Sequence, residues 1–489
     1  MATFTYTNLL TMDLGKLGAA VADWKTMVGD LAKLKTEVSR GLVAKSEAAR
    51  WQGVNATVTR EFVRSTAKEF GDLHLEAESI YNVLQDAYTE LSAVQKRAKK
   101  LDEEARKGGE KDPGMSVSDN GNGTVTVRAL CSKNIPLYSQ RTKDLAQWYA
   151  DTLTGLVAHA SEIDAAVSRA LKNTHGGEPL NPGHAKYTSL DEDQLPRALK
   201  LAALGGDANP QQRAELGRLW QSLSPEARAQ LWKEHKKDLL AAGLLETTVK
   251  RLSPDAGSGP HGAETPGMAE VETRAKMQLL AEAADWRGMA DAGRHMAHYL
   301  NNSGSPMDLP VDKMLSDDKG FQAHIDEQIR RHQSEWRAKA LAEFRRNGGR
   351  PVAIPVQTGN SGYSFDQQKN PNWFFAVGST GSNVTGVVTV EPDANGKPRV
   401  GLDYQANAWD RYNWDKGKGV DIGKFHIPDG QPSRLHTTGL AQEFSMSGSS
   451  SVKHYDLGGS SPNNGALPKP DEPGREGGRT DPGRENATR

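Results

Sequence analysis

Four side chains near the C-terminal end of the chain have the types that general acid–base chemistry requires. They are His426, Asp429, His436 and Glu443. An imidazole that titrates near neutral pH can exchange a proton with a substrate, and a neighbouring carboxylate can orient that ring or act as the base. Because no motif fixes a third group at a set spacing, we interpret the segment as structural and keep His426, His436 and Glu443 as the candidates for catalysis.

A second pattern has the residue types of a transition-metal site. His295 and His298 are three residues apart in an expected helix, with Asp285 and Asp291 at helical offsets. Imidazole nitrogens and carboxylates on adjacent turns can converge on one ion. No third ligand is fixed by a motif, so we expect a solvated helical face and predict no metal and no other cofactor.

The segment from residue 410 to residue 421 mixes glycine, lysine and aromatic residues. Asp415 and Asp421 resemble a cation loop only loosely, because the alternating oxygen ligands of such loops are missing. Lysines beside aromatic rings can contact phosphate or an acidic patch on a partner. The residues in this arrangement are Lys416, Lys418, Lys424, Tyr412 and Trp414. We interpret the segment as a polar hairpin end anchored by its two aromatic residues.

The composition excludes several classes of function. The 489 residues include 61 basic and 62 acidic side chains, a net charge of −1, which argues against a nucleic-acid-binding surface over the whole chain. The single cysteine, Cys131, excludes an internal disulfide and a cysteine-rich zinc site. No uncharged apolar stretch is long enough to span a bilayer, and no basic region precedes an apolar run at the N-terminus. We therefore predict no membrane span and no cleaved signal peptide.

The elements that must position these side chains begin with a helical hairpin. Apolar residues recur every three or four positions over 12–47 and again over 55–101, which predicts two long helices that pack along one seam. Between them, Gly53 suits a tight reversal, Asn55 can cap the second helix, and Trp51 can cover the open end of the hairpin.

Trp51-Gln52-Gly53, placed between two helices of this length, resembles the turn of the WXG family of type VII secretion substrates. The resemblance implies export as a folded helical hairpin, often as a dimer, with Trp51 and Gly53 in a turn that the secretion machinery recognises. The family also carries a Tyr, three residues, then Asp or Glu after the second helix. Here neither Tyr81 nor Tyr88 is followed by an acidic residue at that spacing. Tyr187 is, but it lies far downstream of the second helix.

The remaining pattern predicts a mainly α chain with a C-terminal α+β unit. A β-hairpin over 116–127 and a third helix over 137–172 complete an N-terminal domain, 1–173. A helical middle segment follows at 186–252, then a flexible linker at 253–267. The terminal module, 268–446, combines helices at 268–300 and 319–346 with an antiparallel sheet whose strand candidates include 373–377. Its last strand should bury one face only. Residues 447–489 are rich in Gly, Ser, Pro and charge, and we expect them to be disordered.

The stretch Tyr412-Asn413-Trp414-Asp415 with the following His436 and Glu443 resembles a terminal module of actinobacterial polymorphic-toxin-like proteins. Together, the two resemblances imply a secreted, effector-like protein whose terminal module carries the binding or effector activity. Its expected partners are proteins: a small WXG-like partner, the secretion machinery or a second copy, with no nucleic acid. Two alternatives remain open: an enzymatic toxin with its site in 268–445, and a cytoplasmic structural protein that is not exported.

Overall fold

The structure, a computed structural model, describes residues 4–109, 112–130, 140–174, 186–246, 257–414, 420–422, 425–427 and 430–457. Contacts divide these residues into two compact units. Unit 1 takes the described residues up to 130 and those from 146 to 244, and unit 2 takes residues 140–145 and those from 245 onward. Each unit is described separately.

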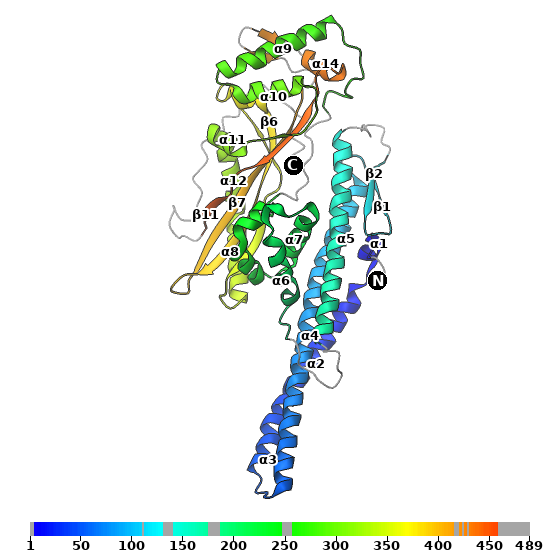
Figure 1. Cartoon of the computed structure of the whole chain (residues 1–489), viewed down its shortest axis with the longest axis vertical. Coiled ribbons are helices and arrows are strands. Elements are labelled where there is room, and N and C mark those ends of the chain that lie inside the picture. Colours follow the sequence, from blue (N-terminus) through cyan, green and yellow to red (C-terminus); the bar gives the residue numbers. More distant parts are fainter. Residues whose placement is uncertain are drawn as a thin grey trace. The chain divides into compact units, whose positions relative to one another are not determined.

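Unit 1 is built on a long helical hairpin (Figure 1). A short helix α1 (Tyr6–Thr11) precedes α2 (Leu14–Glu37), which continues through the π-helical turn η1 (Val38–Val43) into α3 (Ala44–Ala48). The chain reverses at Gly53, whose φ of 101° is a conformation that favours glycine, and returns as the 54-residue helix α4 (Val54–Lys107). The side chains of Thr5 and Asp13 cap α1 and α2 by accepting backbone N–H bonds.

After α4, a two-stranded hairpin of β1 (Met115–Asp119) and β2 (Val125–Ala129) leads to helix α5 (Gln140–Thr174). Buried residues recur along one face of α4, including Val83, Ala87 and Val94, and α5 carries its own buried stripe. The backbone N–H of Val125 donates to the Thr154 hydroxyl, which ties β2 to α5.

Four short helical segments complete unit 1: α6 (Asp191–Ala202), η2 (Gly205–Asp207), α7 (Pro210–Ser222) and α8 (Pro225–Ala241). Helices α7 and α8 begin with a side-chain cap followed by proline, as the sequence pattern favours. The start of this helical middle segment packs on α4 through hydrogen bonds that join Tyr187 to Ser79 and Asn82, and Leu190 to Asp86. The helical middle segment therefore belongs to the same compact unit as the hairpin.

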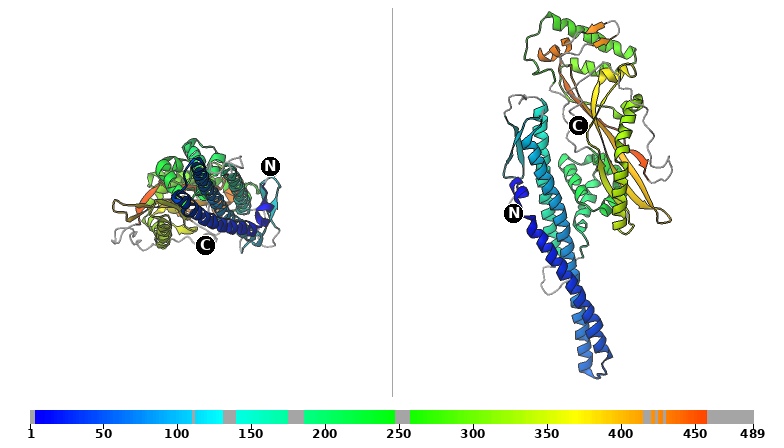
Figure 2. Two further views of the ribbon diagram at one scale, coloured as in Figure 1. Left: turned by 90° about the horizontal axis from the view of Figure 1, so that it is seen from below. Right: turned by 180° about the vertical axis from the view of Figure 1, so that it is seen from behind.

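Unit 2 contains helices α9 (Met268–Trp286), α10 (Ala290–Leu300), α11 (Val311–Asp317), α12 (Lys319–Arg346), α13 (Pro371–Ala376) and α14 (Gln431–Thr437). The expected single helix over 268–300 is divided in two, because Gly288 adopts a φ of 71° between α9 and α10. Figure 2 shows α12 running along the long strands of the sheet in the same unit, and its buried side chains, such as Phe321, Ile325 and Trp336, join the core.

The sheet of unit 2 has the order β3-β10-β7-β6-β4, with β11 added to β7 and β5 added to β6. Its strands are β3 (Met307–Asp308), β4 (Val352–Gln357), β5 (Ser361–Ser364), β6 (Ser379–Pro392), β7 (Pro398–Tyr412), β10 (Phe444–Ser449) and β11 (Lys453–Asp456). All pairings are antiparallel except β10 with β3. A separate two-stranded hairpin joins β8 (Val420–Ile422) to β9 (Phe425–Ile427). The fold class expected from the sequence is confirmed.

Three local expectations for unit 2 were wrong. Residues 373–377 lie mostly in helix α13, because Asn370 caps the first turn and Pro371 starts it. The second face of β7 is not exposed: Asp403 and Asn407 are buried, and Asn407 is hydrogen-bonded to Asn383, Thr385 and Ser449. A polar residue in an alternating pattern therefore does not always face solvent.

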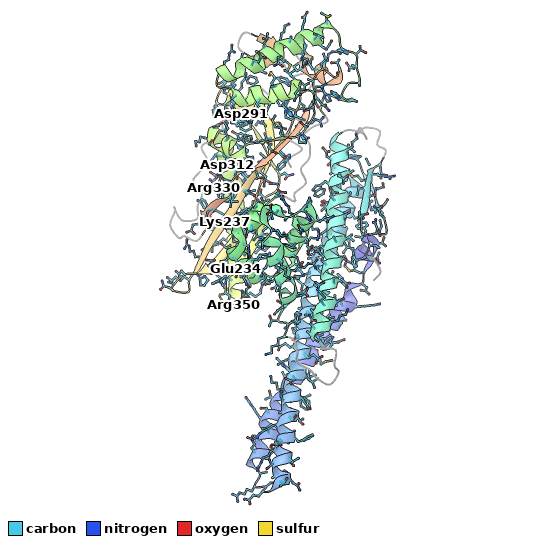
Figure 3. The ribbon with its side chains drawn as sticks, viewed as in Figure 1. Glu234, Lys237, Asp291, Asp312, Arg330 and Arg350 are labelled. Carbon is cyan, nitrogen blue, oxygen red and sulfur yellow. The ribbon has the colours of Figure 1, made fainter. Side chains whose placement is uncertain are left out.

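The third correction concerns the boundary placed at residue 446. Strands β10 and β11 continue the sheet to Asp456, because backbone pairing with β7 needs few apolar side chains. Asp312, labelled in Figure 3, accepts hydrogen bonds from the backbone and hydroxyl of Ser451 and from Lys453, which fixes the connection between these two strands. The rest of the tail expected at 447–489, from 458 onward, lies outside the described residues.

Candidate functional sites

The turn between α3 and α4 exposes large apolar side chains. Trp51 is 56% exposed, Val54 80%, Val58 58% and Phe62 70%. Val54, Val58 and Phe62 are spaced by four residues, so they lie on one face of α4. We call these four residues the tip stripe. Figures 1 and 2 show the helical stretch that ends in α3 running antiparallel to α4 in this part of unit 1.

The turn between α3 and α4 is held by polar contacts of two arginine side chains rather than by a hydrophobic core. Arg60 donates hydrogen bonds to the carbonyl oxygens of Ser46 and Ala49, at 3.1 and 2.8 Å, and more weakly to that of Trp51. Arg64 pairs with Glu47 across the hairpin at 2.9 Å. Space around Gly53 is open. Trp51, which could have covered the open end of the hairpin, is more than half exposed and is not a buried plug.

His436 and Glu443, two of the catalytic candidates, lie together in unit 2 with a residue that sequence reasoning missed. Glu443 is buried and its Oε2 accepts two hydrogen bonds from Arg411, at 3.1 and 3.0 Å. The backbone N–H of Glu443 donates to Nδ1 of His436, so the other ring nitrogen, Nε2, carries the proton. This Nε2 lies 4.0 Å from Glu443 Oε2. Burial lowers the pKa of His436, although the charge of Glu443 opposes that shift.

Residues 257–264, which we call the strap, lie across this buried centre. The sequence placed them in a flexible linker, and this expectation was wrong. The Ser258 N–H donates to Glu443 Oε1 at 2.8 Å, and His436 Nε2 donates to the carbonyl of Gly259 at 2.9 Å. The Ser258 hydroxyl donates to the carbonyl of Trp414. A signal for the strap existed in Gly257-Ser-Gly-Pro, where small residues allow a backbone to approach a buried charge.

The aromatic residues of the terminal motif belong to the core. Tyr412 stacks on Phe444 with ring centroids 5.1 Å apart, and Trp414 meets Tyr412 edge-on at 6.2 Å. Tyr412, Asn413 and Trp414 are all buried. Asp415, the last residue of the motif, lies outside the described residues, as do Lys416, Lys418, Lys424, Asp429 and Cys131. His426 is placed as a backbone position in β9, and its side chain is not described.

The described metal-ligand candidates of α10, which are Asp291, His295 and His298, do not converge on one point. His295 is fully buried, its Nδ1 donates to the carbonyl of Ala376 at 2.8 Å, and burial lowers its pKa to about 4. The ring of His298 is hydrogen-bonded to the backbone carbonyl of Ser305. The side chain of Asp285 is not described. Across the described residues, His, Cys, Asp and Glu side chains form no group of three that could hold a metal ion.

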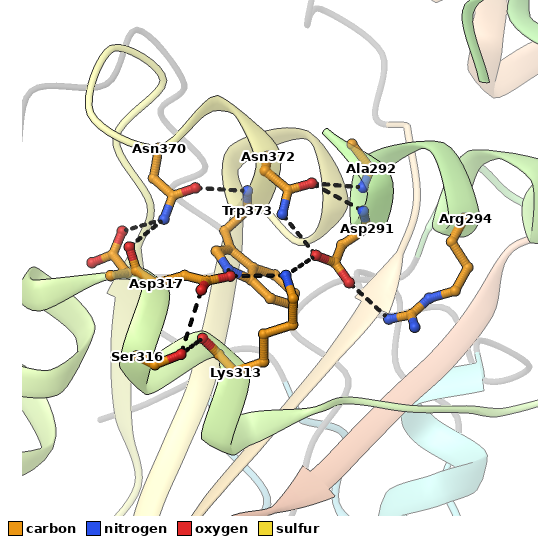
Figure 4. Close-up of polar contacts among 10 residues, drawn as sticks. Asp291, Ala292, Arg294, Lys313, Ser316, Asp317, Asn370, Asn372 and Trp373 are labelled. Carbon is orange, nitrogen blue, oxygen red and sulfur yellow. Dashed lines mark hydrogen bonds and ion pairs between the residues drawn. The ribbon is translucent and has the colours of Figure 1, made fainter. Parts of the chain in front are cut away.

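Asp291 instead anchors a polar cluster between α10, α11 and α13 (Figure 4). It accepts hydrogen bonds from Lys313 at 2.5 Å and from Asn372 at 2.7 Å, and Lys313 also reaches Asp317 at 2.8 Å. Burial alone would raise the pKa of Asp291, but these hydrogen bonds and the Lys313 charge hold it below its ordinary value. Trp373 donates to Asp317 and lies 5.1 Å from the Lys313 ammonium. The cluster joins three helices, and its charges are mutually satisfied.

Comparisons with protein-family models, with curated proteins and with solved structures gave no match. A survey of the described helices found none with both the length and the apolar character needed to cross a bilayer. The function must therefore be inferred from the side chains and the geometry of these two units.

Proposed function

We propose that the chain is a type VII secretion substrate that uses its helical hairpin as the recognition element and carries a binding or effector activity in unit 2. The observation that supports this function most directly is the exposure of Trp51. A ring of this size that seals a hairpin would be buried, whereas a ring that a partner recognises must be accessible. Tryptophan is also the residue type most enriched among the energetic centres of protein interfaces.

The tip stripe extends this argument along α4. Scattered exposed apolar side chains are ordinary, but a contiguous line at helical spacing is typical of a surface that another protein covers. Burying a side chain such as Val58 or Phe62 in an interface contributes roughly 1.5–3 kcal/mol. A helical partner with an apolar stripe of its own fits this surface, either a small WXG-like protein or a second copy of the chain.

Export provides the test of this function. In a bacterium with a working type VII system, the tagged full-length chain should accumulate in the culture medium with its N-terminus intact. Trp51→Ala should lower the exported fraction while leaving the helical circular dichroism unchanged. Leu279→Ala is the matched control, because Leu279 is 66% exposed on α9 in unit 2. Equal export of the Trp51 variant and the control would contradict the proposal, and retention of every variant in the cytosol would favour the non-exported alternative.

An enzymatic toxin is the second candidate, and the proximity of His436 and Glu443 favours it. The two groups lie 4.0 Å apart and are residue types used in general acid–base catalysis, although the Gly259 carbonyl occupies His436 Nε2 while the strap is in place. Full-length protein and a His436→Ala variant expressed inside a bacterial cell would separate the outcomes. Growth arrest that disappears in a folded variant supports an enzyme, while equal growth removes this candidate.

A further inference from the structure

The strap covers charged groups with backbone atoms. Removing the Arg411 and Glu443 charges and the neutral His436 ring from water is unfavourable unless each polar atom has a partner. Glu443 Oε1 receives its hydrogen bond from the Ser258 N–H, and His436 Nε2 finds its acceptor in the Gly259 carbonyl. The side of this centre that faces the strap is therefore complementary to one N–H and one C=O group of a peptide in the turn conformation of the strap, in which Gly257 and Gly259 have positive φ.

Further contacts continue the same pattern along the strap. The N–H groups of Gly262 and Glu264 donate to the carbonyl oxygens of His436 and Thr437, at 3.1 and 2.8 Å. The Glu264 carboxylate pairs with Arg434 at 3.1 Å. A side chain at position 257 would overlap the Glu443 carboxylate. In the middle of the strap the His261 ring lies 5.1 Å from that of His436 and is hydrogen-bonded to Asn302. The surface thus selects a small residue at one end, backbone groups and a histidine in the middle, and an acidic side chain at the other end.

The strap contributes no buried apolar anchor. Gly257 and Ser258 are half-buried, and residues 259–264 are exposed. Hydrogen bonds of this kind each contribute only modestly to stability, and somewhat more where one partner is charged. The surface beneath is held independently of the strap, because Arg411 binds Glu443 and the Glu443 N–H binds His436. The strap can therefore leave without dismantling the centre that it covers.

We propose that the strap is the built-in occupant of a peptide-binding groove formed by α14, the end of β7 and Glu443. The groove accepts, in its place, a peptide of another protein that can adopt the same turns, with a small residue first, a free N–H at the second position and an acidic residue at the eighth. This inference rests on the proposed function, in that unit 2 carries the binding activity. It does not depend on export, so the two can fail separately.

The test uses purified full-length protein and a fluorescent peptide with the strap's sequence, Gly-Ser-Gly-Pro-His-Gly-Ala-Glu. The double variant Gly257→Val, Ser258→Pro should displace the strap, since it adds a side chain against Glu443 and removes the N–H of residue 258. We expect this variant to bind the peptide at least tenfold more tightly than the unmodified chain, measured by fluorescence anisotropy. A matched peptide with proline at its second position lacks the N–H for Glu443 and should bind at least tenfold more weakly.

Equal affinity of the two peptides, or no binding to a folded double variant, would overturn the proposal. If the double variant does not fold, hydrogen exchange on the unmodified chain decides instead. Excess strap peptide should accelerate exchange of the amides of Ser258, Gly262 and Glu264 severalfold, and the proline peptide should not. Exchange that excess peptide leaves unchanged would show that the strap is a fixed part of the fold.

Discussion

Asp86 and Glu90 lie one helical turn apart on α4, and burial raises the pKa of both carboxyl groups, to about 6 for Asp86 and about 7 for Glu90. The Leu190 N–H lowers the pKa of Asp86 and the Arg228 charge lowers that of Glu90, but neither offsets burial. Because the folded chain holds these protons more tightly than the unfolded chain, their stabilising contribution is complete below about pH 4 and is lost as the pH rises through 6 and 7.

The first prediction follows from the direction of these two pKa shifts. Glu90→Gln should raise the free energy of unfolding of unit 1 by about 1–3 kcal/mol at pH 8 and have little effect at pH 4, where the wild-type carboxyl is already protonated. Thermal unfolding followed by circular dichroism at both pH values measures this. Glu103→Gln, an exposed change on the same helix, is the control. Burial lowers the pKa of His159 to about 4, so this residue makes unit 1 less stable as the pH falls, opposite to Asp86 and Glu90. Comparing the two variants with the wild type at each pH removes the contribution of His159.

The second prediction concerns His295, whose pKa of about 4 lies below the ordinary value of 6.5. The neutral ring stabilises unit 2 above pH 6.5, and this contribution is lost as the pH falls toward 4, a difference of about 3 kcal/mol. His295→Phe should remove this part of the pH dependence at the cost of the hydrogen bond to Ala376. Hydrogen exchange of β6 and β7 amides reports on unit 2. An unchanged slope in His295→Phe would refute the assignment.

The third prediction compares two residues of the hairpin tip. Trp51→Ala should change stability by less than about 1 kcal/mol, because the ring is largely in water. Val38→Ala, at a buried position in η1, should cost about 1–3 kcal/mol. Urea unfolding of the two variants gives both values. A large loss from the Trp51 change alone would mean that the ring seals the hairpin.

The fourth prediction tests the close approach of β10 to the segment after β3. A Cβ on Gly448 would overlap the carbonyl oxygen of Leu309, so Gly448→Ala should destabilise unit 2 by about 1–3 kcal/mol. Gly359→Ala places its methyl group in open space and should be nearly neutral. Denaturant midpoints of the two variants provide the comparison, and similar midpoints would argue against the tight contact.

The fifth prediction concerns where unit 2 begins. A fragment that starts at residue 268 lacks the strap and leaves Glu443 and His436 without two of their partners. It should be less stable than a fragment that starts at 257, by about 2–5 kcal/mol. Indistinguishable denaturant midpoints for the two fragments would show that the strap adds no stability.

The helices of unit 1 could be predicted closely from sequence because their apolar spacing is a local signal. The cap expected from Asn55 was wrong, since α4 begins at Val54 without a side-chain cap. The seam over 55–101 became α4, and the β-hairpin around Asn120 lies where its turn residues place it. Residues whose environment depends on distant segments could not be predicted. Arg411 looks like an exposed residue near the end of a strand, yet it is buried against Glu443, 32 positions away. The strap resembles a linker because it consists of small and polar residues, and several of its hydrogen bonds to the rest of unit 2 are made by its backbone.

At the hairpin tip, α3 and the start of α4 pack mainly against each other, and this affects how the tip moves. Most helix stability in proteins comes from packing against other elements, and among the hydrophobic residues of the η1–α3 turn region only Val38 and Ala56 are buried. This end should therefore fray open locally at a lower free energy than the part of α4 that docks α6. A partner that covers the tip stripe would suppress this fraying, so resistance to a protease cutting near Trp51 would report occupancy of the stripe directly.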